Sequence, residues 1–170
     1  MIIKKYCGGS FQVNNFIIAC EETKSAAMID AGGYDENNIY QYLDKNDFKL
    51  EYLFLTHGHV DHICGAKKVH DDRKVPVCLN NGDKFLLDML ETQLSIYGMP
   101  AAKPVETIAP VIDGQIINLG NLVIKIIATP GHSLGSVCYY IESEKVLFAG
   151  DTLFSASIGR TDLPGGSFEQ

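Results

Sequence analysis

Three of the chain's five histidines fall within six consecutive positions of the stretch THGHVDHICG, residues 56–65. This stretch directly follows LEYLFL, a compact apolar run that is typical of a buried strand. In extended backbone, side chains two residues apart point to the same side, so His57 and His59 can bind one metal ion. Asp61 and His62, at the expected first turn of a following helix, can serve a second ion. Imidazole and carboxylate groups are ligands that zinc accepts.

Two later loops each carry one further candidate ligand. IIATPGHSLGS places His132 in a glycine-flanked loop after an apolar strand, and KVLFAGDTLF places Asp151 after the strand at 145–149. Loops at strand ends are where many folds present binding residues, so we expect both side chains to join the site. We disfavour the alternative that these are surface histidines close together by chance. That alternative accounts for a lone histidine, but not readily for three histidines and an aspartate within six positions. We expect Cys64 to pack rather than bind metal, and His70 to be solvated.

Strand-like runs alternate with helix-like runs in the first half of the chain, and hairpin-like strands fill the second half. Strands are expected at 11–20, 25–33, 50–55, 75–79, 115–119, 122–130, 136–143 and 145–150. Helices are expected at 35–48 with Asp35 as the N-cap, at 65–72 and at 81–94, with a loop at 98–110 and an irregular tail. This pattern predicts an α/β fold in which helices cover mixed sheets, and the length of 170 residues predicts one domain, 1–170.

The composition excludes several classes of partner. The formal net charge of −7 argues against nucleic acid and against an anionic membrane, which both favour a basic surface, and we expect neither partner. No apolar run approaches the roughly 20 residues that span a bilayer, and MIIKKYCGGS does not read as a signal peptide. The five cysteines are scattered and form no C-x-x-C pair, which favours the reducing cytoplasm.

The strings HGHVDH, TPGH and GD, in this order, resemble the metallo-β-lactamase fold superfamily. Within it, SIGRTDLPGG resembles the glyoxalase II-like hydrolases, especially small bacterial ones that lack a C-terminal helical domain. The resemblance covers nearly the entire chain. It implies an αββα sandwich of two mixed β-sheets with helices outside, and a binuclear metal site at one edge. It implies these ligands: His57, His59 and His132 for the first metal, Asp61 and His62 for the second, and Asp151 as the bridge.

The chain departs from the family pattern at one point. Family members have a further histidine, well after the bridging aspartate, that completes the second metal site. This chain has no histidine beyond His132 and stops at Gln170, so we expect a C-terminally incomplete domain without its last strand and helix elements. The second site would have at most three protein ligands, and we expect the first site to survive better. A homo-oligomer that buries the gap is a further expectation.

The resemblance and the chemistry of the ligands together favour a metal-dependent hydrolase of small thioesters. Two divalent ions can hold a hydroxide at neutral pH, and Asp61 can orient it for attack on a carbonyl. A thiol has a pKa of about 8.5, so a thiolate leaves with little protonation. The resemblance implies hydroxyacyl-glutathione as substrate, and another small thioester or ester stays open. Arg160 can bind substrate or pair with Asp162, and the sequence slightly favours the pair.

The sequence does not determine which metal binds, and it leaves some rival functions open. We expect up to two Zn²⁺ per chain, but imidazole and carboxylate also suit iron and manganese. The first rival is a mononuclear iron persulfide dioxygenase, because those proteins share H-x-H-x-D-H and GRTD. The second is a truncated metal-binding fragment without activity. A nuclease is disfavoured by the acidic charge, and a lactamase by the expected cytoplasmic location.

Overall fold

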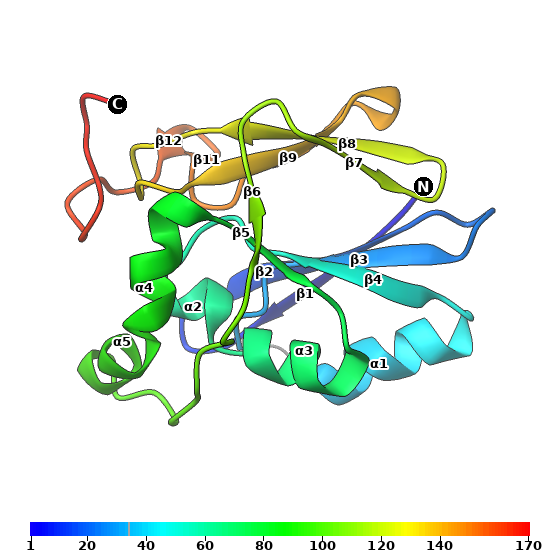
Figure 1. Ribbon diagram of the computed structural model, residues 1–170, viewed down its shortest axis with the longest axis horizontal. Helices are drawn as coiled ribbons and strands as arrows, with labels where there is room; N and C mark the ends of the chain where they lie inside the picture. The colour runs from blue at the N-terminus through cyan, green and yellow to red at the C-terminus, as the bar shows by residue number, and fades with distance from the viewer. Residues whose placement is uncertain (34) are drawn as a thin grey trace.

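The computed structural model describes residues 1–33 and 35–170, which form two stacked β-sheets with helices on one side (Figure 1). The first sheet has six strands in the order β1 to β6: Ile2–Gly8, Val13–Ala19, Ser25–Ile29, Lys49–Phe54, Val77–Asn80 and Ala109–Val111. β1, β2 and β3 pair antiparallel, whereas β3, β4, β5 and β6 pair parallel. This sheet is therefore mixed, as expected.

The second sheet has four strands in the order β10-β9-β8-β7: Val146–Phe148, Val137–Ile141, Leu122–Ala128 and Ile116–Leu119. All of its pairings are antiparallel, so it differs from the expectation that both sheets are mixed. The reason is its short connections, because tight turns can join only antiparallel neighbours. A small hairpin of β11 (Leu153–Phe154) and β12 (Ser157–Ile158) follows, in the tail expected to be irregular.

Five α-helices lie beside the first sheet: α1 (Glu36–Lys45), α2 (Val60–Ile63), α3 (Ala66–Arg73), α4 (Lys84–Asp88) and α5 (Leu90–Ile96). Figure 1 shows α1 and α3 on the face of this sheet that points away from the second sheet, while α2, α4 and α5 gather at one end. Within residues 1–33 and 35–170, no α-helix covers the outer face of the second sheet. The α/β sandwich is confirmed, with its layers in the order α, β, β.

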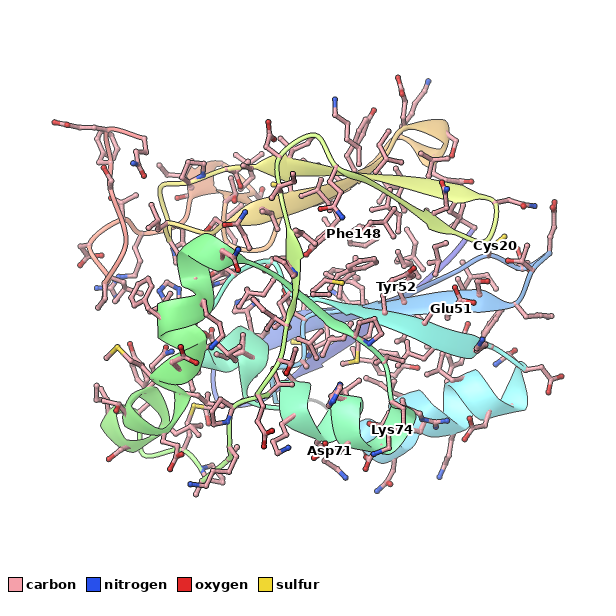
Figure 2. All side chains as sticks on the ribbon, viewed as in Figure 1. Cys20, Glu51, Tyr52, Asp71, Lys74 and Phe148 are labelled. Atoms are coloured by element: carbon pink, nitrogen blue, oxygen red, sulfur yellow. The ribbon has the colours of Figure 1, made fainter. Side chains whose placement is uncertain are left out.

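Two apolar cores hold these layers together. One lies between the helices and the first sheet, and the other lies between the two sheets. The first sheet is covered on both faces, so Ile17 and Ile18 of β2 are both buried although they point in opposite directions. In β8 burial alternates, with Ile124 buried and Val123 exposed. Figure 2 shows Tyr52 and Phe148 in the space between the sheets.

The helices and strands mostly lie where the sequence predicts them. The Asp35 side chain caps α1 by accepting a hydrogen bond from the Asn38 N–H at 3.3 Å. The helix expected at 81–94 is divided by Met89, whose φ of −87° and ψ of 10° leave the helical region. The sequence missed β1 and β6. Both are edge strands. β1 mixes apolar residues with lysines, and β6 has only three residues, one of them Pro110, which a central strand would exclude.

Two expectations concern the environment of the chain. Within the described part, no helix is long and apolar enough to cross a membrane. All five cysteines are free thiols, and only Cys7 is exposed.

One hydrogen bond joins the second sheet to the strand that leads into the histidine stretch. The hydroxyl of the fully buried Tyr139 donates to the Leu55 carbonyl at 2.8 Å. We expect Tyr139→Phe to lower the free energy of unfolding by about 1–2 kcal/mol, because it leaves this buried carbonyl without its partner. Urea denaturation measures the change. The control is Tyr52→Phe at a half-buried ring, expected to cost about 0.5 kcal/mol or less; equal losses in the two variants would contradict the assignment.

Candidate metal centre

Three histidines from two distant loops converge at one end of the sandwich. His57 and His59 follow β4, and His132 lies in the loop between β8 and β9. His132 Nε2 lies 3.2 Å from His57 Nε2 and 2.8 Å from His59 Nδ1. All three side chains are buried. The structure thus brings together the residues expected to bind the first metal.

The second cluster adjoins the first. His62 Nε2 lies 3.3 Å from Asp151 Oδ1 and 3.7 Å from Asp61 Oδ2. The other Asp151 oxygen lies 3.7 Å from His132 Nε2, so this carboxylate stands between the two clusters, where a bridging ligand is expected. Asp61 and His62 belong to α2, the short helix that starts one residue after His59.

Two observations test whether the clusters fit metal ions. Two nitrogen ligands of one tetrahedral zinc ion lie about 3.3 Å apart, and the spacings of 2.8 and 3.2 Å around His132 are close to that value. The second observation is His62 Nε2, a buried atom that makes no hydrogen bond despite its carboxylate neighbours. Leaving such an atom without a partner costs about 1–3 kcal/mol. A cation between the rings and carboxylates would satisfy it, so the residues fit a metal centre.

Three of the four rings are held from behind by hydrogen bonds that fix their orientation. His57 Nδ1 lies 3.0 Å from the Thr56 hydroxyl, and His132 Nδ1 donates to the Arg160 carbonyl at 2.7 Å. Such contacts select the ring nitrogen that faces a metal. The Arg160 contact is notable because it links the GRTD segment to a metal-ligand candidate through the backbone rather than through the guanidinium.

The support of the third ring, that of His62, was missed by sequence reasoning. Asp30, at the end of β3, lies 2.9 Å from His62 Nδ1 and accepts hydrogen bonds from the Thr56 N–H and hydroxyl. A signal was present, because Asp30 follows a fully buried apolar strand just as Asp151 follows β10. Its position at the end of a strand therefore made Asp30 a candidate site residue on the same grounds as Asp151.

A second buried carboxylate joins the two histidine loops. Asp83 is fully buried and accepts hydrogen bonds from the Gly58 N–H at 2.7 Å, the Ser133 hydroxyl at 2.6 Å and the Gly135 N–H at 2.6 Å. Asp83 falls in the first turn of the helix expected at 81–94, and sequence reasoning did not single it out as a site residue. It lies instead in a 3₁₀ turn, Asn81–Asp83, that precedes α4. Asp83 therefore positions His57, His59 and His132 indirectly, through the loops that carry them.

The electrostatics of the first cluster suit metal ligands. Burial lowers the pKa of His57 well below its usual 6.5, and the neighbouring imidazoles lower it further. Burial and the ring of His132 lower the pKa of His59 to about 4. Both rings are therefore neutral at pH 7, which is the state that binds a metal.

The second cluster has the opposite electrostatics. Burial opposes the charged form of His62, but the carboxylates of Asp30, Asp151 and Asp61 outweigh it and raise the pKa of His62 well above 6.5. Burial raises the pKa of Asp61, whereas for Asp151 the attraction of the histidines outweighs burial and lowers the pKa. This half of the site attracts positive charge, and a bound cation would take the place of the proton on His62.

A pocket of about 320 Å³ opens above these residues. Its floor includes His59, Asp61, His132 and Asp151, and its walls include Phe11, Tyr97, Phe154, Ile158, Arg160 and Leu163. The centre is therefore accessible to a small molecule although most of its ligand atoms are buried.

The remaining candidates lie outside the clusters. The Cys64 thiol lies 3.9 Å from the Ala31 carbonyl, and burial raises its pKa, which agrees with the packing role expected for it. The expectation that His70 is solvated is wrong. Its ring is half-buried, and Nδ1 donates to the Val75 carbonyl at 2.8 Å, which ties the end of α3 to the segment before β5.

Stacked sheets with a cluster of histidines and carboxylates at the strand ends define a metal-binding protein of the α/β sandwich class. The family model described as the metallo-beta-lactamase superfamily matches residues 8–170, and the chain belongs to that superfamily. The predicted family is therefore confirmed.

Individual relatives agree with this assignment. A Haemophilus influenzae protein named hydroxyacylglutathione hydrolase GloC is 36% identical over 165 residues, which cover 94% of this chain and 76% of that protein. The crystal structure of BLEG-1, described as a B3 metallo-beta-lactamase, is similar with a TM-score of 0.85 and 32% identity, covering 99% of this chain and 80% of BLEG-1. TTHA1623, in a di-iron-bound form, has a TM-score of 0.87 and 26% identity, with coverage of 98% and 80%.

Gly159 gives a test of the contact between the GRTD segment and the metal centre. A Cβ atom at this position would overlap the Asp151 carbonyl oxygen and lie 3.0 Å from His132 Nδ1. We expect Gly159→Ala to reduce metal affinity by about 10–100-fold, the usual effect of displacing the groups that orient ligands. Elemental analysis after dialysis measures bound metal, with Ser157→Ala in the neighbouring hairpin as the control. Wild-type metal content in Gly159→Ala would contradict this geometry.

Proposed function

We propose that the protein is a metal-dependent hydrolase of small thioesters. Members of the metallo-beta-lactamase superfamily are typically metal-dependent hydrolases, and the relatives agree with this general class. The observation that carries the proposal is the pair of adjoining clusters beneath one pocket, whose lining includes His59 and His132 of the first cluster and Asp61 and Asp151 of the second. Two adjacent metal-binding clusters suit the hydrolysis of a carbonyl compound.

The residues divide into two sets of ligands. His57, His59 and His132 would hold one ion, Asp61 and His62 would hold the other, and Asp151 would contact both. Divalent ions in such a centre supply Lewis acidity and a nucleophile at neutral pH. Zinc is the metal we propose, with iron and manganese as alternatives; the di-iron form of TTHA1623 keeps iron in consideration.

The chain's own groups position the reaction. The Asp61 carboxylate lines the pocket and can accept a hydrogen bond from the attacking water, which aims the water at the carbonyl carbon of the substrate. The C–S bond breaks, a C–O bond forms, and the products are a carboxylic acid and a thiol. Because a thiolate leaves with little protonation, the reaction does not depend on a strong general acid in the pocket.

The class of substrate is supported by a relative. The Haemophilus influenzae protein carries the name of a hydroxyacylglutathione hydrolase, so hydroxyacyl-glutathione thioesters are the first class to test, with other small thioesters and esters after them. The cytoplasmic location, a homo-oligomer and the lack of nucleic-acid or membrane partners stay predictions.

We expect His57→Ala and Asp151→Ala each to lower thioesterase activity by at least about 100-fold, because removing a ligand costs more than disturbing its supports. Turnover of a thioester by the zinc-loaded protein, followed as thiol release, measures the effect. His70→Ala is the matched control, since His70 lies outside both clusters.

Other results would favour a rival function. Turnover retained in both ligand variants would contradict the hydrolase. Oxygen consumption with a persulfide by the iron-loaded protein, without thioesterase activity, would favour the persulfide dioxygenase. Bound metal with neither activity would favour a metal-binding fragment.

A further inference from the structure

The walls of the pocket above the metal centre are largely apolar. The β11–β12 hairpin supplies Phe154 and Ile158, and the pocket is also lined by Phe11 and Tyr97, whose rings meet edge to face with their centroids 5.3 Å apart. Phe154 is 51% exposed and Ile158 is 54% exposed. Apolar side chains that stay exposed around a pocket favour an apolar ligand, because binding removes their surface from water.

The charge of the walls is nearly neutral. Arg160 is the one lysine or arginine among the described residues that line this pocket. Its guanidinium makes two hydrogen bonds to Asp162, from Nε to Oδ1 and from Nη2 to Oδ2, each 2.7 Å long. These bonds neutralise the charge of Arg160 within an ion pair, although the guanidinium keeps N–H donors on Nη1 and Nη2.

Asp162 is a persistent partner for Arg160. It lies two residues away in the chain, so its effective concentration at the guanidinium exceeds that of a dissolved substrate carboxylate. The hydrogen bond from Arg160 lowers the pKa of Asp162 to about 2, so the carboxylate stays ionised at any pH at which a thioesterase is assayed. An anionic substrate therefore meets a neutral ion pair, rather than a lone cation, at the one lysine or arginine of the described pocket lining.

We propose that the pocket selects thioesters whose acyl and thiol parts are apolar and uncharged, and that Asp162 sets this specificity by neutralising Arg160. The proposal rests on the thioesterase function above and deepens it. It differs from the expectation raised by the glutathione-hydrolase name of one relative, because glutathione thioesters carry carboxylates on the thiol part. Asp162 is a specificity-determining residue in this view and takes no part in bond cleavage.

The test uses two substrates with the same acyl group. One is the thioester of N-acetylcysteamine, which is neutral, and the other is the thioester of 3-mercaptopropionate, which carries one carboxylate. The readout is the ratio of kcat/KM for the neutral substrate to kcat/KM for the anionic one, so a general loss of activity in a variant cancels. We expect the wild-type ratio to be about ten or more, and Asp162→Asn to lower it about fivefold to tenfold, because one charge-assisted contact becomes available.

Two further variants isolate the cause. Adding Arg160→Gln to Asp162→Asn should restore the wild-type ratio, since the freed cation is then removed. Asp44→Asn is the matched control: Asp44 forms a similar exposed two-bond pair with Arg73, on the helices away from the pocket, and its loss should leave the ratio unchanged. Binding of the corresponding uncleavable thioethers, measured by calorimetry, should show the same preference without turnover.

The outcomes separate this proposal from the proposed function. Cleavage of both thioesters with a ratio near one, or a ratio that Asp162→Asn does not change, would overturn the specificity and leave the hydrolase standing. Cleavage of neither thioester, together with preferential binding of the neutral thioether, would overturn the thioesterase and support the pocket assignment. Equal binding of both thioethers would overturn the pocket assignment.

Discussion

The buried carboxylate of Asp30 is the contact on which the geometry of the metal centre most depends. It lies at the end of β3, accepts hydrogen bonds from the Thr56 N–H and hydroxyl, and approaches His62 Nδ1 at 2.9 Å. A buried charge is costly unless it is paired and hydrogen-bonded. The chain can therefore bury Asp30 only when the loop after β4 and the helix α2 both occupy their places. The same contact that stabilises the sheet ends thus orients one of the metal-ligand candidates.

The candidate metal ligands are held by short hydrogen bonds, whereas the walls of the pocket above them are exposed. Asp83 joins the loops around Gly58 and Ser133, and the Arg160 carbonyl holds His132 from behind. These hydrogen bonds are buried or half-buried and short, so the rings are positioned before any ligand arrives. The apolar walls above them are half exposed and come from loops and a small hairpin. The fold thereby fixes the candidate metal ligands, while the proposed specificity rests on surface segments.

Sequence reasoning found the ligand candidates because their pattern is local. His57 and His59 are two residues apart after a buried strand, and His132 and Asp151 each follow an apolar run, so strand ends alone indicated where they lie. It missed Asp30 and Asp83. Asp30 does follow a buried strand, but its role, like that of Asp83, arises from contacts with residues 25 to 52 positions away. It also missed β1 and β6, because an edge strand is stabilised by its neighbour more than by its own composition.

The sequence by itself determined the class of the fold, the family and the candidate metal ligands, since burial patterns and ligand spacing are properties of short segments. The tertiary structure decided which side chains meet. His132 reaches His57 and His59 across 75 and 73 residues of chain, which required the second sheet to stack on the first in one register. It also decided that Arg160 turns its carbonyl to the metal centre and its guanidinium to Asp162. Such pairings depend on the closure of long loops and the order of strands, and no local pattern encodes them.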